Sequence, residues 1–169
     1  MRRQTFFLLV MLAASTLSAA AQNAPARSST SKSATSFDTL ADFALAAMRT
    51  RAEQLKIGGV AVVAYFQGDH LQSWSSKMVV VGRYKDDPSP TDKGSNLLGI
   101  AYAKAAEMAD TLKDSGSQVR PPMTGEFGWT GGAITHVKNG YLIAAFSGGK
   151  SDDDLEVSRT GLAKLKAGF

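Results

Sequence analysis

The sequence predicts an α+β domain in which an antiparallel β-sheet packs against helices, in the order α-β-β-α-β-β-α. Apolar residues recur at three- and four-residue steps in three separate segments, which is the spacing of an amphipathic helix. Between these segments lie two pairs of β-rich runs, and each pair is joined by a turn. Such hairpins imply antiparallel strands with helices against them. We expect the four strands to form one meander.

The first helix is expected to begin after Ser36, a good N-cap, and to run to about Lys56, where two glycines follow. Residues 60–66 form an uninterrupted β-rich run, which indicates a strand covered on both faces. A turn at 67–70 and a second strand at 71–81 complete the first hairpin.

The middle of the chain alternates loops with one helix. A polar loop over 82–94 is long for a compact domain, and long loops are often functional. The second helix is expected from Ser95 to about Asp114, with alanines that allow close approach to a sheet. Residues 115–130 are expected to be irregular, since they contain two adjacent prolines and several glycines.

The last hairpin has the clearest local signal. Two β-rich runs flank Asn139-Gly140, the preferred pair for a type I′ turn, which would place His136 opposite Ile143. The final helix then follows, with Ser151 as its expected N-cap and acids at 152–154 in its first turn, where they complement the helix dipole.

Three regions follow along the chain: a signal peptide at 1–21, a flexible leader at 22–36 and the α+β domain at 37–169. Arg2 and Arg3, a short apolar stretch and small residues before Ala21 are typical of a cleavable export signal, which is too short to be a stable membrane anchor. We therefore expect a periplasmic or secreted protein; general secretory export is expected, although the paired arginines leave the twin-arginine route open.

Composition excludes several chemistries. The chain has no cysteine, so disulfides, thiolate metal sites and cysteine nucleophiles are excluded. Removal of residues 1–21 would leave 17 basic and 15 acidic residues, and the basic ones are scattered along the sequence. No nucleic-acid partner is therefore expected.

The two histidines are candidate ligands with equally ordinary alternatives. His70 lies at the expected first turn, where it could ligate a metal, act as a general base or be a solvated turn residue. His136 lies on the amphipathic face of the last hairpin, near Tyr141, where it could ligate haem iron or be a half-buried structural histidine. Neither histidine has a spacing typical of a zinc site.

Backbone donors offer a second kind of candidate. Ser147-Gly148-Gly149 before the last helix could form an anion nest, although the lysine-serine pair of a P-loop is missing. Gly131-Gly132 could bring the backbone close to a ligand or simply begin a strand. The three acids at 152–154 are interpreted as helix capping, because no calcium-loop spacing follows them.

The domain resembles the GlcG/HbpS family of haem-binding or haem-degrading domains, which is also similar to the C-terminal domain of PduO-type proteins. The resemblance covers about residues 37–166 as short motifs in the same order. The longer loop at 82–94, a missing proline near Ile134 and alanines at 144–145 depart from the family pattern. The matching motifs are Val62-Val63-Ala64 through Gly68-Asp69-His70-Leu71, Ala103-Lys104-Ala105, Gly131-Gly132, Asn139-Gly140, Ser147-Gly148-Gly149 with Asp154, and Gly161-Leu162-Ala163.

This resemblance implies a homo-oligomeric protein that binds a small molecule, with haem or a related tetrapyrrole as the first ligand to consider. His70 would then be the first choice as haem iron ligand and His136 the second, while Lys104 and Arg83 would pair with propionates. Two alternatives stay open: an enzyme that acts on a small hydroxy acid or degrades haem, holding an anion on the two glycine segments, and a structural oligomer subunit without a ligand.

The first prediction concerns export. Expression of the full chain in a bacterial host is expected to yield, outside the cytoplasm, a protein that begins at Gln22, because the small residues before it suit signal peptidase. Intact-mass spectrometry of the fractionated protein measures this. An uncleaved chain that stays in the cytoplasm would contradict the assignment.

Overall fold

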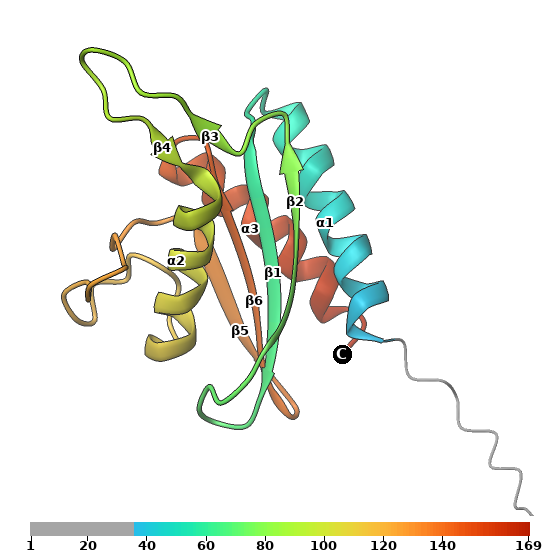
Figure 1. Cartoon of the computed structure of the whole chain (residues 1–169). Helices are drawn as coiled ribbons and strands as arrows, with labels where there is room; N and C mark the ends of the chain where they lie inside the picture. The colour runs from blue at the N-terminus through green and yellow to red at the C-terminus, as the bar shows by residue number, and fades with distance from the viewer. Residues whose placement is uncertain (1–35) are drawn as a thin grey trace, which may run out of the picture. The chain divides into compact units, whose positions relative to one another are not determined.

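The computed structural model describes residues 36–169, so the expected signal peptide at 1–21 and all of the leader except Ser36 lie outside the described residues. The α+β class and the order of its main elements are confirmed (Figure 1). The elements are α1 (Phe37–Gln54), β1 (Gly59–Gln67), β2 (Ser75–Val81), β3 (Lys85–Asp86), β4 (Ser95–Asn96), α2 (Leu97–Thr111), β5 (Gly132–Val137), β6 (Gly140–Ser147) and α3 (Ser151–Lys166).

The four long strands form an antiparallel sheet in the order β2-β1-β6-β5. The expectation of a meander is wrong, because β1 pairs with β6 rather than the second strand pairing with the third. The two most apolar strands thereby occupy the centre, and each hairpin supplies one edge strand. This order brings the start of β1 beside the end of β6, with Val60 opposite Ser147.

Helices cover both faces of the sheet (Figure 1). Alternate residues of β1 point to opposite faces: Ala61 and Val63 pack with α1 and α3, whereas Val62 and Ala64 pack on the side of α2. This arrangement confirms that β1 is covered on both faces, as its unbroken apolar run predicts.

The register of the last hairpin differs from the expectation. Lys138 and Asn139 form the turn, and His136 lies opposite Tyr141 rather than Ile143. Gly140 is instead the first residue of β6, with a φ of 152°, and a Cβ there would overlap the carbonyl oxygen of Phe66. Glycine is therefore required at position 140 by the close approach of β1, and not by the conformation of the turn.

The helix starts follow the sequence in part. Ser36 caps α1, and its side chain accepts the Thr39 N–H, as expected. The expected start of α2 at Ser95 is wrong, because Ser95 and Asn96 form β4, and Asn96 caps the helix. The N-cap of α3 is Lys150 rather than Ser151, so α3 begins without a side-chain cap.

Both long loops are fixed by arginine. Arg83 leads into the β3–β4 pair, which occupies part of the loop at 82–94. Arg120 donates hydrogen bonds to Asp110 of α2 and to Glu126 within the irregular segment. The hydrogen bond from Arg120 lowers the pKa of Glu126 to about 2, so this contact stays charged at neutral pH. The segment that reaches Trp129 is thereby held against α2.

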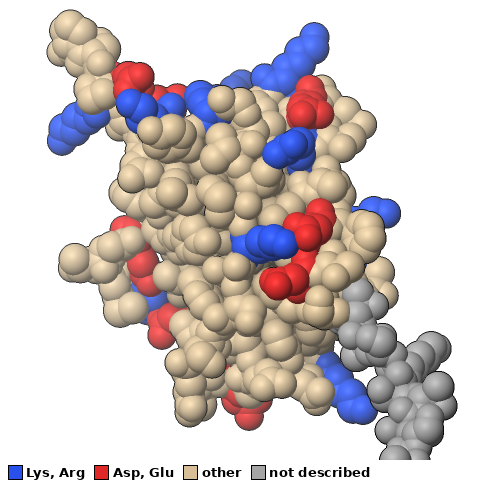
Figure 2. Space-filling view, turned by 45° about the vertical axis from the view of Figure 1, so that its right-hand side comes forward, with Lys and Arg blue, Asp and Glu red and all other residues tan. Residues whose placement is uncertain are grey.

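Several surface charges form ion pairs with a neighbour of the opposite sign. Lys77 lies 2.8 Å from Asp42, and Arg51 pairs with Glu156. The face shown in Figure 2 accordingly carries basic and acidic side chains close together rather than one patch of a single sign. Among the described residues, no helix is both long and apolar enough to cross a membrane.

Candidate functional site

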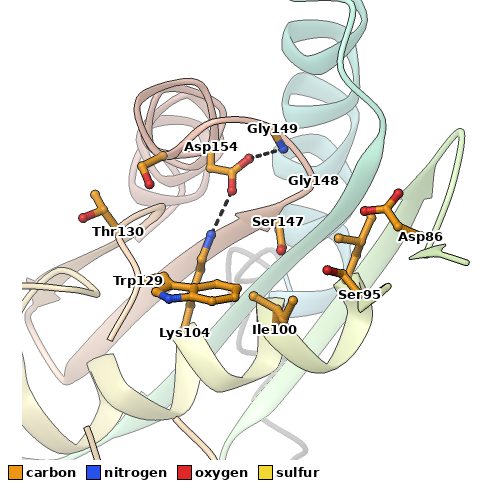
Figure 3. Close-up of a pocket in the computed structure, with 12 residues that line it drawn as sticks. Asp86, Ser95, Ile100, Lys104, Trp129, Thr130, Ser147, Gly148, Gly149 and Asp154 are labelled. Carbon is orange, nitrogen blue, oxygen red and sulfur yellow. Dashed lines mark hydrogen bonds and ion pairs between the residues drawn. The ribbon is translucent and has the colours of Figure 1, made fainter. Parts of the chain in front are cut away.

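A hollow of about 190 Å³ lies where the end of β6 and the start of α3 meet the start of α2. The β3–β4 pair closes one side, and the segment before β5 closes the other (Figure 3). This arrangement follows from the sheet order, since the ends of the central strands meet the N-termini of two helices there. The hollow is lined by Asp86, Ser95, Leu97, Ile100, Lys104, Trp129, Thr130, Ser147, Gly148, Gly149, Ser151 and Asp154.

A buried ion pair forms one wall of the pocket. Lys104 of α2 donates to an Asp154 carboxylate oxygen of α3 over 2.9 Å, and the two side chains are 3% and 5% exposed. Lys104 Nζ also donates to the Phe146 carbonyl over 2.8 Å. The other Asp154 oxygen accepts the N–H of Gly149 over 2.8 Å (Figure 3). Both charges are thus hydrogen-bonded, as buried charges require.

Lys104 reaches the Phe146 carbonyl because the edge strand β5 begins only at Gly132 and does not extend over this carbonyl. Phe146 donates its N–H to the carbonyl of Gly131, whereas its own carbonyl accepts Lys104 Nζ instead of a further strand donor. Gly131 has a φ of +135°, and a Cβ there would collide with Lys104 Nζ and lie 2.8 Å from the Asp154 Cβ. Only glycine leaves room for the pair.

Burial raises the pKa of Asp154 above its ordinary value, while the charge and hydrogen bond of Lys104 and the backbone N–H groups act in the opposite direction. A carboxyl with a raised folded-state pKa favours folding below its ordinary pKa, and that contribution is lost as the pH rises through the raised value. At neutral pH the pair therefore fixes the geometry more than it adds stability.

The start of α3 presents hydrogen-bond donors to the pocket. The first N–H groups of a helix have no partner within it, and Lys150 supplies no side-chain cap. Ser151, the first helical residue, lines the pocket. The acids at 152 and 153 flank the same turn, as the sequence predicts.

Ser147 is a second, independent feature of this site. It is 3% exposed, and its hydroxyl makes no hydrogen bond with any residue that the structure describes. The hydroxyl lines the pocket between Lys104 and Ser95 (Figure 3). No fully buried side-chain nitrogen or oxygen of the described residues lacks a hydrogen-bond partner, so this hydroxyl keeps its access to the hollow. A ligand or an ordered water in the hollow would be its hydrogen-bond partner.

Asp86 and Arg83 hold the opposite side of the pocket. Arg83 Nε donates to an Asp86 oxygen over 2.6 Å, and its two terminal nitrogens donate to the carbonyls of Gly58 and Gly148. The arginine therefore ties the β3–β4 pair to the loop before α3. These contacts use the donors of Arg83, and Arg83 does not line the pocket. The expectation that it pairs with a ligand propionate is therefore not supported at this pocket.

The structure brings four of the sequence candidates together. Lys104 and the Ser147-Gly148-Gly149 segment line one pocket. Gly131 lies directly behind the ion pair, and Gly132 donates its N–H to Ser115 over 2.8 Å. The expectation that Gly131-Gly132 supplies donors to an anion is thus not met for Gly132.

The two histidines lie away from the pocket. His70 is exposed in the loop after β1, and exposed His136 lies on β5 against the Tyr141 ring. Both are near the Gln67 end of β1, whereas the pocket is near its Gly59 end, roughly 26 Å along the strand at ~3.3 Å per residue. The structure does not place either histidine with the other candidates.

The pocket residues do not fit a haem group. Drug-sized ligands occupy pockets of roughly 300–1,000 Å³, larger than the hollow of about 190 Å³ found here. The hollow also lacks a histidine. In the part of the chain that the structure describes, no group of three or more acidic or histidine side chains is arranged to hold a metal ion.

Sequence reasoning missed several lining residues. Asp154 was interpreted only as a capping residue; it lies in the first turn of α3 and accepts the Gly149 N–H, but it also pairs with Lys104. A signal existed, because Lys104 falls on the apolar stripe of its helix with Ala101 and Met108, where a lysine needs a buried partner. Asp86 lies on the short strand β3 and Trp129 in the irregular segment before β5. The local sequence does not predict where either residue lies relative to the other lining residues.

The comparisons with known proteins identify no family. No family model matches the chain, and no curated protein matches it. Among solved structures, a double mutant of HbpS from Streptomyces reticuli is 18% identical, with a TM-score of 0.43, over 89% of this chain and 97% of that chain. This identity and TM-score assign no ligand or activity to the chain.

The buried pair gives a prediction about stability. Lys104→Met is expected to lower the free energy of unfolding by about 3–5 kcal/mol, because it leaves Asp154 buried without its countercharge. Lys104→Met combined with Asp154→Asn should recover part of this loss, since a neutral amide still accepts the Gly149 N–H. Urea unfolding at pH 7 measures both variants.

Lys77→Met is the matched control, because Lys77 pairs with Asp42 on the surface. It should change stability far less. Equal effects of the two single lysine variants, or no recovery in the double variant, would show that burial of the pair has been misjudged.

Proposed function

We propose that this domain binds the anionic group of a small molecule, such as a carboxylate, in the pocket at the start of α3. The observation that carries the proposal is the Ser147 hydroxyl, which opens onto the hollow without a hydrogen bond to another described residue, beside an uncapped helix N-terminus. Helix N-termini bind anions through free N–H groups and the helix dipole. The hydroxyl adds a donor at the same place.

Lys104 adds a hydrogen-bond donor to this region, while its charge is balanced by Asp154. Its ammonium has three N–H groups, of which Phe146 and Asp154 accept two. The remaining donor, the Ser147 hydroxyl and the start of α3 belong to one pocket wall. A carboxylate has enough lone pairs to accept from all three.

Binding is better supported than turnover. The titratable side chains that line the hollow are Asp86, Lys104 and Asp154, and each is already hydrogen-bonded to another residue. Nucleophilic catalysis by Ser147 would require a general base hydrogen-bonded to its hydroxyl. Among the described residues, no side chain makes such a hydrogen bond. Haem binding, export and homo-oligomeric assembly remain predictions from the sequence.

Acetate titration tests the proposal. Saturable NMR shifts are expected at the amides of Gly148 to Ser151, because these residues surround the expected carboxylate position. Ser147→Ala should weaken acetate binding by about tenfold, since it removes one hydrogen bond to a charged group.

Ser75→Ala is the control, because Ser75 is exposed on β2 and pairs with Tyr65 at the other end of the sheet. It should leave acetate binding unchanged. Shifts spread evenly over the protein, or equal affinity in the Ser147→Ala variant, would contradict the proposed site.

A further inference from the structure

We infer that the ligand of this pocket is a small zwitterion that carries both a carboxylate and an ammonium group, of the size of a small α-amino acid. This inference rests on the proposed function, which places the carboxylate at the start of α3. It adds the second group of the ligand, and the argument for it comes from the charges on the opposite wall and from the volume.

The charged side chains of the pocket favour a ligand without net charge. Two acids and one base line the hollow, namely Asp86, Asp154 and Lys104. Each acid already has one basic partner, since Arg83 pairs with Asp86. With all four charges balanced, only the partial charge of the helix end is left to neutralise an anion. A dianion such as sulfate is therefore poorly compensated.

The two ends of the pocket have opposite character. Donors gather on the wall formed by Ser147 and the start of α3, whereas Asp86 lies on the far side of Ser147 from Trp129 (Figure 3). Arg83 uses one Asp86 oxygen, and the other makes no hydrogen bond with the described residues. This free carboxylate oxygen can accept a hydrogen bond from a ligand ammonium.

The volume limits the ligand. The hollow of about 190 Å³ is smaller than the pockets of roughly 300–1,000 Å³ that hold drug-sized ligands, which favours a small molecule. Alanine, with its six non-hydrogen atoms, is a small member of the proposed class. Trp129 is 50% exposed at one side of the opening, so a longer side chain would leave the hollow along the indole.

Three acids with the same carbon skeleton test the inference by calorimetric titration. Propionate offers the carboxylate alone, lactate adds a hydroxyl, and alanine adds an ammonium. Alanine is expected to bind about fivefold more tightly than either of the others, the effect of one partly exposed ion pair. Sulfate should bind more weakly than propionate.

Asp86→Asn should remove the advantage of alanine over propionate, because the amide keeps an acceptor for Arg83 but loses the charge. Asp87→Asn is the matched control, since Asp87 pairs with Lys85 outside the pocket. An advantage that survives Asp86→Asn overturns the inference, as does equal binding of the three acids or stronger binding of lactate. Those results leave the proposed function standing, whereas no binding by any acid would refute both.

Discussion

The ion pair between Lys104 and Asp154 is the contact on which the arrangement of this site depends. It joins α2 and α3, two helices that pack on opposite faces of the sheet. The connection passes beside the start of β5, where Gly131 leaves an opening next to the Phe146 carbonyl. Each charge satisfies the other inside the protein, and neither can be removed alone without leaving a buried charge.

The pair also determines what the pocket can offer a ligand. Asp154 uses the Gly149 N–H and thereby fixes the loop that leads into α3. Arg83 fixes the same loop from the opposite side through the Gly148 carbonyl. The first turn of α3 and the Ser147 hydroxyl are then held between two rigid contacts. Such a site is already formed before a ligand arrives, which reduces the entropy lost on binding.

The sequence predicted the elements of the fold better than their connections in space. The apolar run of β1 correctly indicated a strand covered on both faces, because burial on two sides leaves no polar positions. The sheet order was missed, since pairing between β1 and β6 depends on packing over the whole domain. The turn at Lys138 was misplaced because Gly140 serves the contact with Phe66 rather than the turn.

The site was predictable in pieces. Lys104 and the segment Ser147 to Gly149 were candidates from a family resemblance, and the structure brings them together. Asp154 looked like an ordinary capping acid, because three adjacent acids at a helix start have a sufficient local explanation. Its real partner is 50 residues away, and such a pairing follows only from the three-dimensional fold.

Site-resolved NMR of the pair tests this account most directly. If the pair is buried as described, the Asp154 carboxyl will titrate above the ordinary pKa of an aspartate, and the Lys104 ammonium protons will exchange slowly with water. An Asp154 that titrates at or below that ordinary pKa, with Lys104 exchanging as fast as the surface residue Lys77, would contradict the account.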